Sequence, residues 1–417
     1  MTTSKISGPR SNRREETQKL TDWRWVRLGD CVAKIGSGFT PLGGHAVYQS
    51  SGAPLIRSQN VHMNRFEPNG LAFISDEQSA EMESSQVLAG DVLLNITGAS
   101  IGRVCVAPTE YCPANVNQHV CIIRSDGTLD SELLSFYFAS HEFQKFIMSS
   151  QAGATRQALT KAMIEKFRVP YAELSEQRRI AAQLREQMTA VEHARAAVQA
   201  QLDAAQTLPA ALLRAVFESG KWKWLRIDEL TETCSGTTPS RSRQDFYGGR
   251  IPWVKTGELV DGIIHDTEEH ITETALRETS LRLLPKNTLL IAMYGQGQTR
   301  GRTALLACEA TTNQACYAIL PNEHFDPKFL QLWFQFSYAR LRQASEGRGG
   351  NQSNFNGKVL GAEKVPLPTI PEQQAIITRL DAELTAVRTL VETLETRLAE
   401  IELLPPALLR RAFNGEN

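Results

Sequence analysis

Apolar residues recur along one stretch of the chain at alternating steps of four and three positions, with polar residues between them. This heptad spacing predicts one long helix from Glu176 to Phe217 that packs against another helix. The same spacing returns 196 residues later and predicts a second long helix from Glu372 to Phe413. The predicted seam consists of Leu184, Met188, Val191, Val198, Leu202 and Ala205 in the first copy, and of Leu380, Leu384, Val387, Val391, Leu394, Leu398 and Ile401 in the second.

Arg195 occupies a seam position where the second copy has Val391. A charge on a seam costs stability and can fix register, but the arginine stem can also lie along apolar surface while the guanidinium reaches water. We expect the second of these arrangements. One polar position does not remove the heptad pattern.

Proline follows both seams, at Pro209 and at Pro405 with Pro406. Because proline lacks an amide donor and clashes with the preceding turn, we expect each long helix to kink or end there. Thr369 and Glu372 have capping-box spacing at the start of the second helix. About 33 residues at roughly 1.5 Å per residue make a rod on the order of 50 Å long. The alternative is a pair of ordinary core helices in one domain, but two matching seams favour paired antiparallel rods.

The segment before each rod is also duplicated. Trp23-Arg24-Trp25-Val26-Arg27-Leu28 is matched 199 residues later by Trp222-Lys223-Trp224-Leu225-Arg226-Ile227, and further blocks follow at offsets near 198. Short apolar strands, Gly/Pro/Asn turns and few helices indicate an α+β fold in each segment. The prediction is a pseudo-two-fold repeat with two tandem globular domains separated by two long antiparallel coiled-coil helices. Its parts are a flexible basic tail at 1–20, domains at 21–172 and 220–368, and long helices at 173–219 and 369–417.

Composition limits the class of protein. The chain has 417 residues, 41% hydrophobic and 22% charged, which is typical of globular proteins with more than one core. No apolar run approaches the ~18 residues that span a bilayer and no secretory signal is present, so we expect a cytoplasmic protein without membrane contact. The seven cysteines are scattered and form no C-x-x-C pair, which favours buried thiols over disulfides or a zinc site.

Motifs for catalysis are missing from the sequence. There is no phosphate-binding loop, no G-x-S-x-G elbow and no H-E-x-x-H. The run from Gly295 to Gly301 approaches a dinucleotide fingerprint, but its last glycine is wrongly spaced and no helical pattern follows. We therefore predict no catalytic residue, no metal site and no bound cofactor. A net charge of −1 indicates that, if the protein binds nucleic acid, partners neutralise part of the phosphate charge.

Both globular segments carry side chains suited to reading base edges, placed in glycine-bearing turns. Arginine can engage guanine, Asn or Gln can engage adenine, and Ser or Thr can serve either base. Each such residue could instead be an ordinary solvated turn residue. Asn117 and Asn313, retained in both halves, favour that structural role. The predicted DNA-binding residues are Arg57, Ser58, Asn60, Thr97, Ser100, Arg103, Arg156 and Gln157 in the first copy, and Lys255, Thr256, Tyr294, Gln296, Gln298, Thr299, Arg300, Arg302, Arg348, Asn351, Gln352 and Asn354 in the second.

The repeated opening, the Pro54-to-Val61 strand and the Ser175-to-Leu184 helix start resemble the specificity subunit of Type I restriction-modification systems. The resemblance implies a non-catalytic protein whose two target recognition domains each read half of a bipartite, asymmetric site in double-stranded DNA. It also implies two modification subunits that bind S-adenosylmethionine and methylate adenine, and restriction subunits that use ATP. Two alternatives remain: an enzyme with a hidden active site between the repeats, and a non-catalytic tandem-repeat scaffold for protein interactions.

Overall fold

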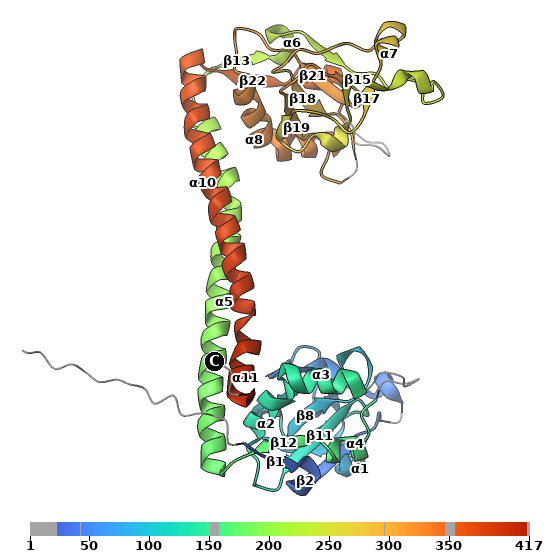
Figure 1. The fold of residues 1–417 in the computed structure, drawn as a ribbon, viewed down its shortest axis with the longest axis vertical. Helices are drawn as coiled ribbons and strands as arrows, with labels where there is room; N and C mark the ends of the chain where they lie inside the picture. Colours follow the sequence, from blue (N-terminus) through green and yellow to red (C-terminus); the bar gives the residue numbers. More distant parts are fainter. Residues whose placement is uncertain (1–22, 42, 151–157, 296, 347–354, 415–417) are drawn as a thin grey trace, which may run out of the picture. The chain divides into compact units, whose positions relative to one another are not determined.

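The computed structural model describes residues 23–41, 43–150, 158–295, 297–346 and 355–414. The predicted basic tail at 1–20 therefore lies outside the described residues. The chain divides into two units, residues 1–198 with 397–417 and residues 199–396. The division runs through both long helices, so each unit contains one globular domain and part of each helix (Figure 1).

In the first unit, hydrophobic strands with short turns form two four-stranded sheets. The central sheet has the order β2-β11-β8-β9, with the bounds Val32–Ser37, Val120–Ser125, Val92–Asn95 and Val104–Val106. The second has the order β6-β3-β10-β7, with the bounds Ala72–Ile74, Ala53–Ile56, Ala114–Val116 and Gln86–Val87. Two-stranded sheets pair β1 (Arg24–Arg27) with β12 (Arg168–Tyr171) and β4 (Val61–His62) with β5 (Arg65–Phe66).

Helices cover the central sheet of the first unit. These helices are α2 (Ser131–Phe138), α3 (His141–Ser150) and α4 (Lys161–Glu165), and Figure 1 shows α2 and α3 beside β8. The short helix α1 (Asp76–Glu81) lies between β6 and β7 in the chain. Every residue of β8 is buried, because the strand lies between sheet neighbours and the helices pack over it. Phe138, Phe143 and Phe167 pack together in this core, the first two with ring centroids 4.4 Å apart.

The second unit repeats this plan. Its central sheet has the order β14-β21-β18-β19-β16, with the bounds Thr233–Ser235, Cys316–Ile319, Leu289–Ala292, Thr303–Leu306 and Gly262–Ile264. A second sheet has the order β17-β15-β20, with the bounds His270–Ile271, Tyr247–Val254 and Thr311–Thr312. β13 (Lys223–Arg226) pairs with β22 (Lys364–Leu367), and the helices are α6 (Ile227–Leu230), α7 (Glu273–Glu278), α8 (Pro327–Glu346) and α9 (Gly357–Gly361).

Equivalent strands occupy equivalent places in the two units. In both central sheets the last long strand, β11 or β21, lies between the first strand and β8 or β18, and all these pairs are antiparallel. In both second sheets the parallel pair is the same, β3 with β10 and β15 with β20. The prediction of an α+β repeat is confirmed, including its two tandem domains.

The first long helix, α5, runs from Leu174 to Phe217, and the second, α10, from Ile370 to Glu402. All the predicted seam residues are buried or half-buried. Arg195 is exposed and ion-pairs with Glu192 of the same helix at 3.0 Å, so the guanidinium does reach solvent. None of the described helices is both long and apolar enough to cross a membrane.

The long helix does not end at Pro209, because α5 continues through that proline for two further turns, as far as the predicted end at Phe217. The stop in the second copy is confirmed, since α10 ends at Glu402 and α11 (Leu404–Asn414) begins just before Pro405 and Pro406. Prolines in a first helical turn lose no hydrogen bond, because amides there have no partner within the helix. A single proline within a helix costs one bond, which the packing at the end of α5 outweighs.

Each domain core is completed by a helix end from a distant part of the chain. In the first unit Leu409, Ala412 and Phe413 of α11 join the core that also holds the start of α5. In the second unit the end of α5 joins the core that also holds Leu380 of α10, through Leu213, Val216 and Phe217. Because the start of one helix meets the end of the other in each unit, the two helices are antiparallel.

Candidate nucleic-acid interface

The turn between β8 and β9 carries three of the predicted reading residues of the first copy. Its frame is closed by hydrogen bonds from the Gly102 amide to the Asn95 carbonyl (2.9 Å) and from the Arg103 amide to the Ser100 carbonyl (3.1 Å). Gly98 and Gly102 both have positive φ angles, +73° and +86°, which glycine adopts without strain. The exposed tip is thereby held between two buried strands.

The turn between β18 and β19 has the same frame in the second copy. The Gly301 amide donates to the Ala292 carbonyl (2.8 Å) and the Arg302 amide donates to the Thr299 carbonyl (3.0 Å). The segment between these bonds is two residues longer than in the first copy. The two turns therefore share one scaffold and differ in the length and side chains of their tips.

Several predicted reading residues of the first copy have structural partners. The Asn60 side chain is fully buried, accepts from the Arg57 amide and donates to the Glu67 carbonyl, so it holds its own loop. Arg57 donates to the Gly70 carbonyl at 2.6 Å and lies over the Tyr48 ring. Thr97 Oγ1 lies 2.5 Å from Nδ1 of His119.

Ser58, Ser100 and Arg103 are half-buried at the surface of the same unit. Within the described part of the chain, no hydrogen bond or ion pair ties the Arg103 guanidinium to another side chain. Arg103 is therefore the cation of this turn that a phosphate or a base could engage without first displacing an acidic partner.

Lys255 of the second copy is held by acidic neighbours. Its ammonium group lies 3.0 Å from carboxylate oxygens of both Glu268 and Glu269, which raises the pKa of Lys255 above its ordinary value. The backbone amide of Lys255 donates to the Glu258 carboxylate. In the first copy the backbone amide of Arg57 donates to the Asn60 side chain in the same way. Thr256, the next residue, is half-buried.

The second turn holds its residues in different environments. Gln298 is exposed and accepts a hydrogen bond from Arg302, which also lies 3.8 Å from Asp261. Arg300 is only 9% exposed and its guanidinium lies 5.9 Å from the centre of the Phe355 ring. Tyr294 and Thr299 are half-buried. Among the described residues predicted to read bases in this turn, Gln298 is thus the exposed one.

Seven of the predicted DNA-binding residues lie outside the described residues. They are Arg156, Gln157, Gln296, Arg348, Asn351, Gln352 and Asn354.

Asn117 and Asn313 have the same structural role in both halves. Each side-chain oxygen accepts the amide of the residue two places on, at 3.1 Å. The side-chain oxygen of the next residue, Gln118 or Gln314, accepts a hydrogen bond from a threonine hydroxyl, that of Thr40 or Thr238 respectively. The hydrogen bonds of Asn117 and Asn313 fit the interpretation of these two asparagines as structural residues.

Sequence reasoning overlooked a cluster of arginines and aromatic rings in the second unit. The Arg241 guanidinium lies 4.6 Å from the Tyr247 ring centre and 5.2 Å from that of Trp253, and pairs with Glu269 at 2.6 Å. Arg241 and then Lys255 lower the pKa of Glu269, through hydrogen bonds to its carboxylate. The available signal was the run Ser240-Arg241-Ser242-Arg243, which has no arginine or lysine counterpart in the first copy.

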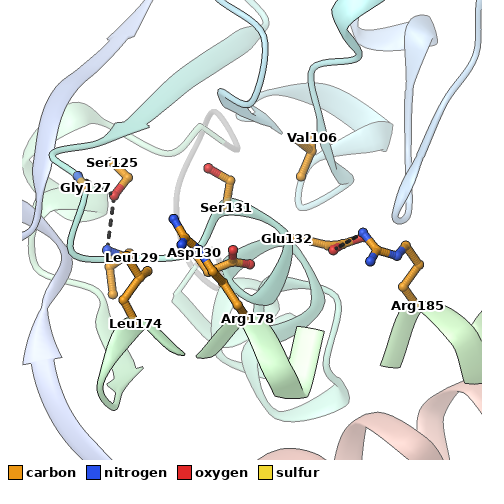
Figure 2. Close-up of a pocket in the computed structure, with 10 residues that line it drawn as sticks. All are labelled: Val106, Ser125, Gly127, Leu129, Asp130, Ser131, Glu132, Leu174, Arg178 and Arg185. Carbon is orange, nitrogen blue, oxygen red and sulfur yellow. Dashed lines mark hydrogen bonds and ion pairs between the residues drawn. The ribbon is translucent and has the colours of Figure 1, made fainter. Parts of the chain in front are cut away.

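A polar pocket in the first unit lies where α5 meets the domain. Figure 2 shows Glu132 of α2 facing Arg185 of α5, and their charged groups are 2.9 Å apart. Burial raises the pKa of Glu132, while Arg185 acts in the opposite direction. The equivalent positions in the second unit are Lys328 and Asp381, 3.8 Å apart, so the same contact is made with the charges exchanged. The pocket's ion pair therefore joins helix to domain.

Most of the chain is similar to known proteins. Residues 21–197 and 219–403 each match the family model described as Type I restriction modification DNA specificity domain. The Type I restriction enzyme EcoR124I/EcoR124II specificity subunit of Escherichia coli is 29% identical over 189 residues, covering 45% of this chain and 46% of that protein. The matched part thus spans about half of that relative. The EcoBI specificity subunit of Escherichia coli is 23% identical over 94% of this chain and 86% of its own length.

Solved structures resemble the fold over nearly the full length. The HsdS subunit from Thermoanaerobacter tengcongensis has a TM-score of 0.67 at 19% identity, covering 95% of this chain and 97% of that one. A chain from a structure on complex assembly and conformational transition of the type I R-M system has a TM-score of 0.70, also at 19% identity, covering 94% and 97%. At these identities the likeness concerns the fold.

Proposed function

Because the chain belongs to the Type I restriction modification DNA specificity family, as the sequence resemblance predicted, we propose that it is the subunit that selects the DNA site of such a system. In this proposal it binds double-stranded DNA at a bipartite, asymmetric site, and each domain reads one half. The chain itself performs no catalysis. From here on the two domains are called recognition domains.

The observation that carries the proposal is a shared frame with unlike tips. The turns after β8 and β18 close with matching backbone hydrogen bonds, yet the exposed Ala99 stands where the other half has the exposed Gln298. Direct readout needs different side chains for different bases, whereas contacts that position a duplex carry no sequence information. Two copies of one scaffold with different tips suit a site whose halves differ.

Partners complete the proposed assembly. Two modification subunits would bind S-adenosylmethionine and methylate adenine, and restriction subunits would use ATP, while this chain holds no cofactor. A net charge of −1 supports a division of labour in which partners supply much of the positive charge around the duplex. An assembly that acts on cellular DNA is expected in the cytoplasm.

Methylated-base sequencing of cells with and without this chain tests the proposal. We expect a split motif, two short specified blocks separated by an unread spacer, to be methylated only when the chain and its modification subunits are present. A methylome that does not change with the chain would overturn the proposal. The remaining alternative would then be a scaffold for protein interactions. A DNA-binding assay of the chain with its partners at several salt concentrations distinguishes the two, because binding to DNA phosphates weakens as salt rises.

A further inference from the structure

We call the turn between β8 and β9 and the turn between β18 and β19 the reading turns. In both halves, a side chain from a neighbouring helix donates hydrogen bonds to backbone carbonyls of the reading turn. In the first unit Gln144 of α3 donates from Nε2 to the Gly102 carbonyl of the turn (2.8 Å) and to the Phe138 carbonyl (2.6 Å). One amide group thus joins the turn to the end of α2. Gln144 is half-buried, so solvent competes only partly for these bonds.

In the second unit the turn is held by Arg342 of α8, which follows the buried Leu341 as Gln144 follows the buried Phe143. Its Nη1 donates to the Arg300 carbonyl and its Nη2 to the Gly297 carbonyl, both at 3.0 Å. Tyr338, one helical turn earlier, donates its hydroxyl to the Gln298 carbonyl at 2.6 Å and lies beneath the Arg342 guanidinium. Three backbone carbonyls of the turn therefore accept hydrogen bonds from side chains of the same helix.

The change from glutamine to arginine follows the length of the turn. The second turn is two residues longer, so its tip has more backbone to order. A guanidinium carries its donors in a planar fork and can bridge two carbonyls. A side-chain amide has two donors on one nitrogen, so the carbonyls that it bridges must lie closer together. Each half thus has a support matched to its own tip.

The glycines in these turns fit the same arrangement. A Cβ at Gly102 would come within 2.7 Å of the Gln144 side chain, and one at Gly301 within 3.3 Å of Tyr338. The φ angle is +86° at Gly102 and +88° at Gly301. The backbone therefore approaches the helix closely on the side opposite to the exposed tip.

We propose that Gln144 and Arg342 form a turn clamp, a pair of positioning residues that fix the reading turn of one half-site each. Neither needs to touch DNA. By holding backbone carbonyls, each sets the conformation in which the tip side chains meet base edges, and without it the tip samples several conformations and discriminates less. This inference rests on the proposed function.

The test uses the full-length chain assembled with its modification subunits and duplexes in which one half-site is randomised while the other is fixed. We expect Arg342→Ala to lower discrimination in the half read by the second domain by on the order of tenfold, the size of one lost base contact, and to leave the other half unchanged. Gln144→Ala should do the converse. Arg342→Gln, which places the first domain's clamp residue in the second, should retain more discrimination than Arg342→Ala.

Arg340→Ala is the matched control, because Arg340 lies on the same helix, is exposed and pairs with Glu363 away from the turn. Amide hydrogen exchange supplies a readout that does not depend on DNA: Arg342→Ala should accelerate exchange at residues 297–302, and Arg340→Ala should not. Unchanged exchange there would overturn the clamp even if the protein reads DNA as proposed. Equal loss in both halves would also overturn it, whereas a wild-type assembly that selects no split site would refute the proposed function instead.

Discussion

A buried glutamine joins each long helix to its recognition domain. Gln177 in the first turn of α5 accepts from the Asp130 amide (2.9 Å) and donates to the carbonyls of Thr128 (2.9 Å) and Ala172 (2.8 Å). Its counterpart Gln373 makes the same three kinds of bond in the second unit and is fully buried. A buried amide with all these partners fixes the direction in which the helix leaves the domain.

Gln373→Leu is therefore expected to destabilise the second unit. Leucine has a similar volume but leaves one amide and two carbonyls unpaired in the interior, which costs about 2–4 kcal/mol in the free energy of unfolding. The exposed neighbour Gln374 gives the control substitution Gln374→Leu, expected within about 0.5 kcal/mol of the wild type. Denaturant unfolding of both variants measures the difference, and similar values for the two would contradict this role.

The C-terminal helix α11 belongs to the core of the first recognition domain. The Phe413 ring lies 5.3 Å from that of Tyr137 in α2, and its neighbour Trp23 donates from Nε1 to the Ala412 carbonyl at 3.2 Å. The end of α5 does the same for the second domain, where the Phe217 and Trp333 rings are 5.3 Å apart. An element distant in sequence thus closes each core.

Phe413→Ala should destabilise the first unit and leave the second unchanged. Phe413 is 5% exposed, and removing a buried phenylalanine typically costs about 3–5 kcal/mol through lost burial and the cavity left behind. Amide exchange should accelerate in α2 and α3 but not in α8. Arg411→Ala, an exposed residue of the same helix, serves as the control. Loss of protection in both units would contradict the assignment of α11 to one core.

At the scale of the whole molecule, the paired helices are expected to set the spacing between the half-sites. Heptad packing keeps the helices in register, and the glutamine and ion-pair contacts fix each domain to its helix. In this view the length of α5 and α10 determines how much DNA lies unread between the halves.

A four-residue insertion after Val191 should lengthen the unread spacer. Four helical residues add about 6 Å, which corresponds to roughly two base pairs at 3.4 Å each. Methylated-base mapping of the variant with its modification subunits measures the spacer. The same insertion after the exposed Ala89, in a surface turn between β7 and β8, is the control and should not change it. A spacer that stays constant in the Val191 variant would rule out the helices as the determinant.

The sequence by itself determined the periodic and repeated features of this protein. Heptad spacing reports which face of a helix is buried, so the seam and the two long helices were readable from residue types alone. The duplicated blocks likewise revealed two equivalent domains and the family. Such patterns are local, and each copy supports the interpretation of the other.

Only the tertiary structure decided contacts between segments far apart in the chain. Arg300 lies in a glycine-rich turn and looks exposed in sequence, yet Phe355 from a distant segment packs against it and α8 holds its carbonyl. From the sequence, Pro209 could either kink or end the helix, and only the structure shows that α5 continues past it into the core of the second unit. The clamp residues Gln144 and Arg342 carry no shared residue type. Their common role comes from position in space, which no local pattern records.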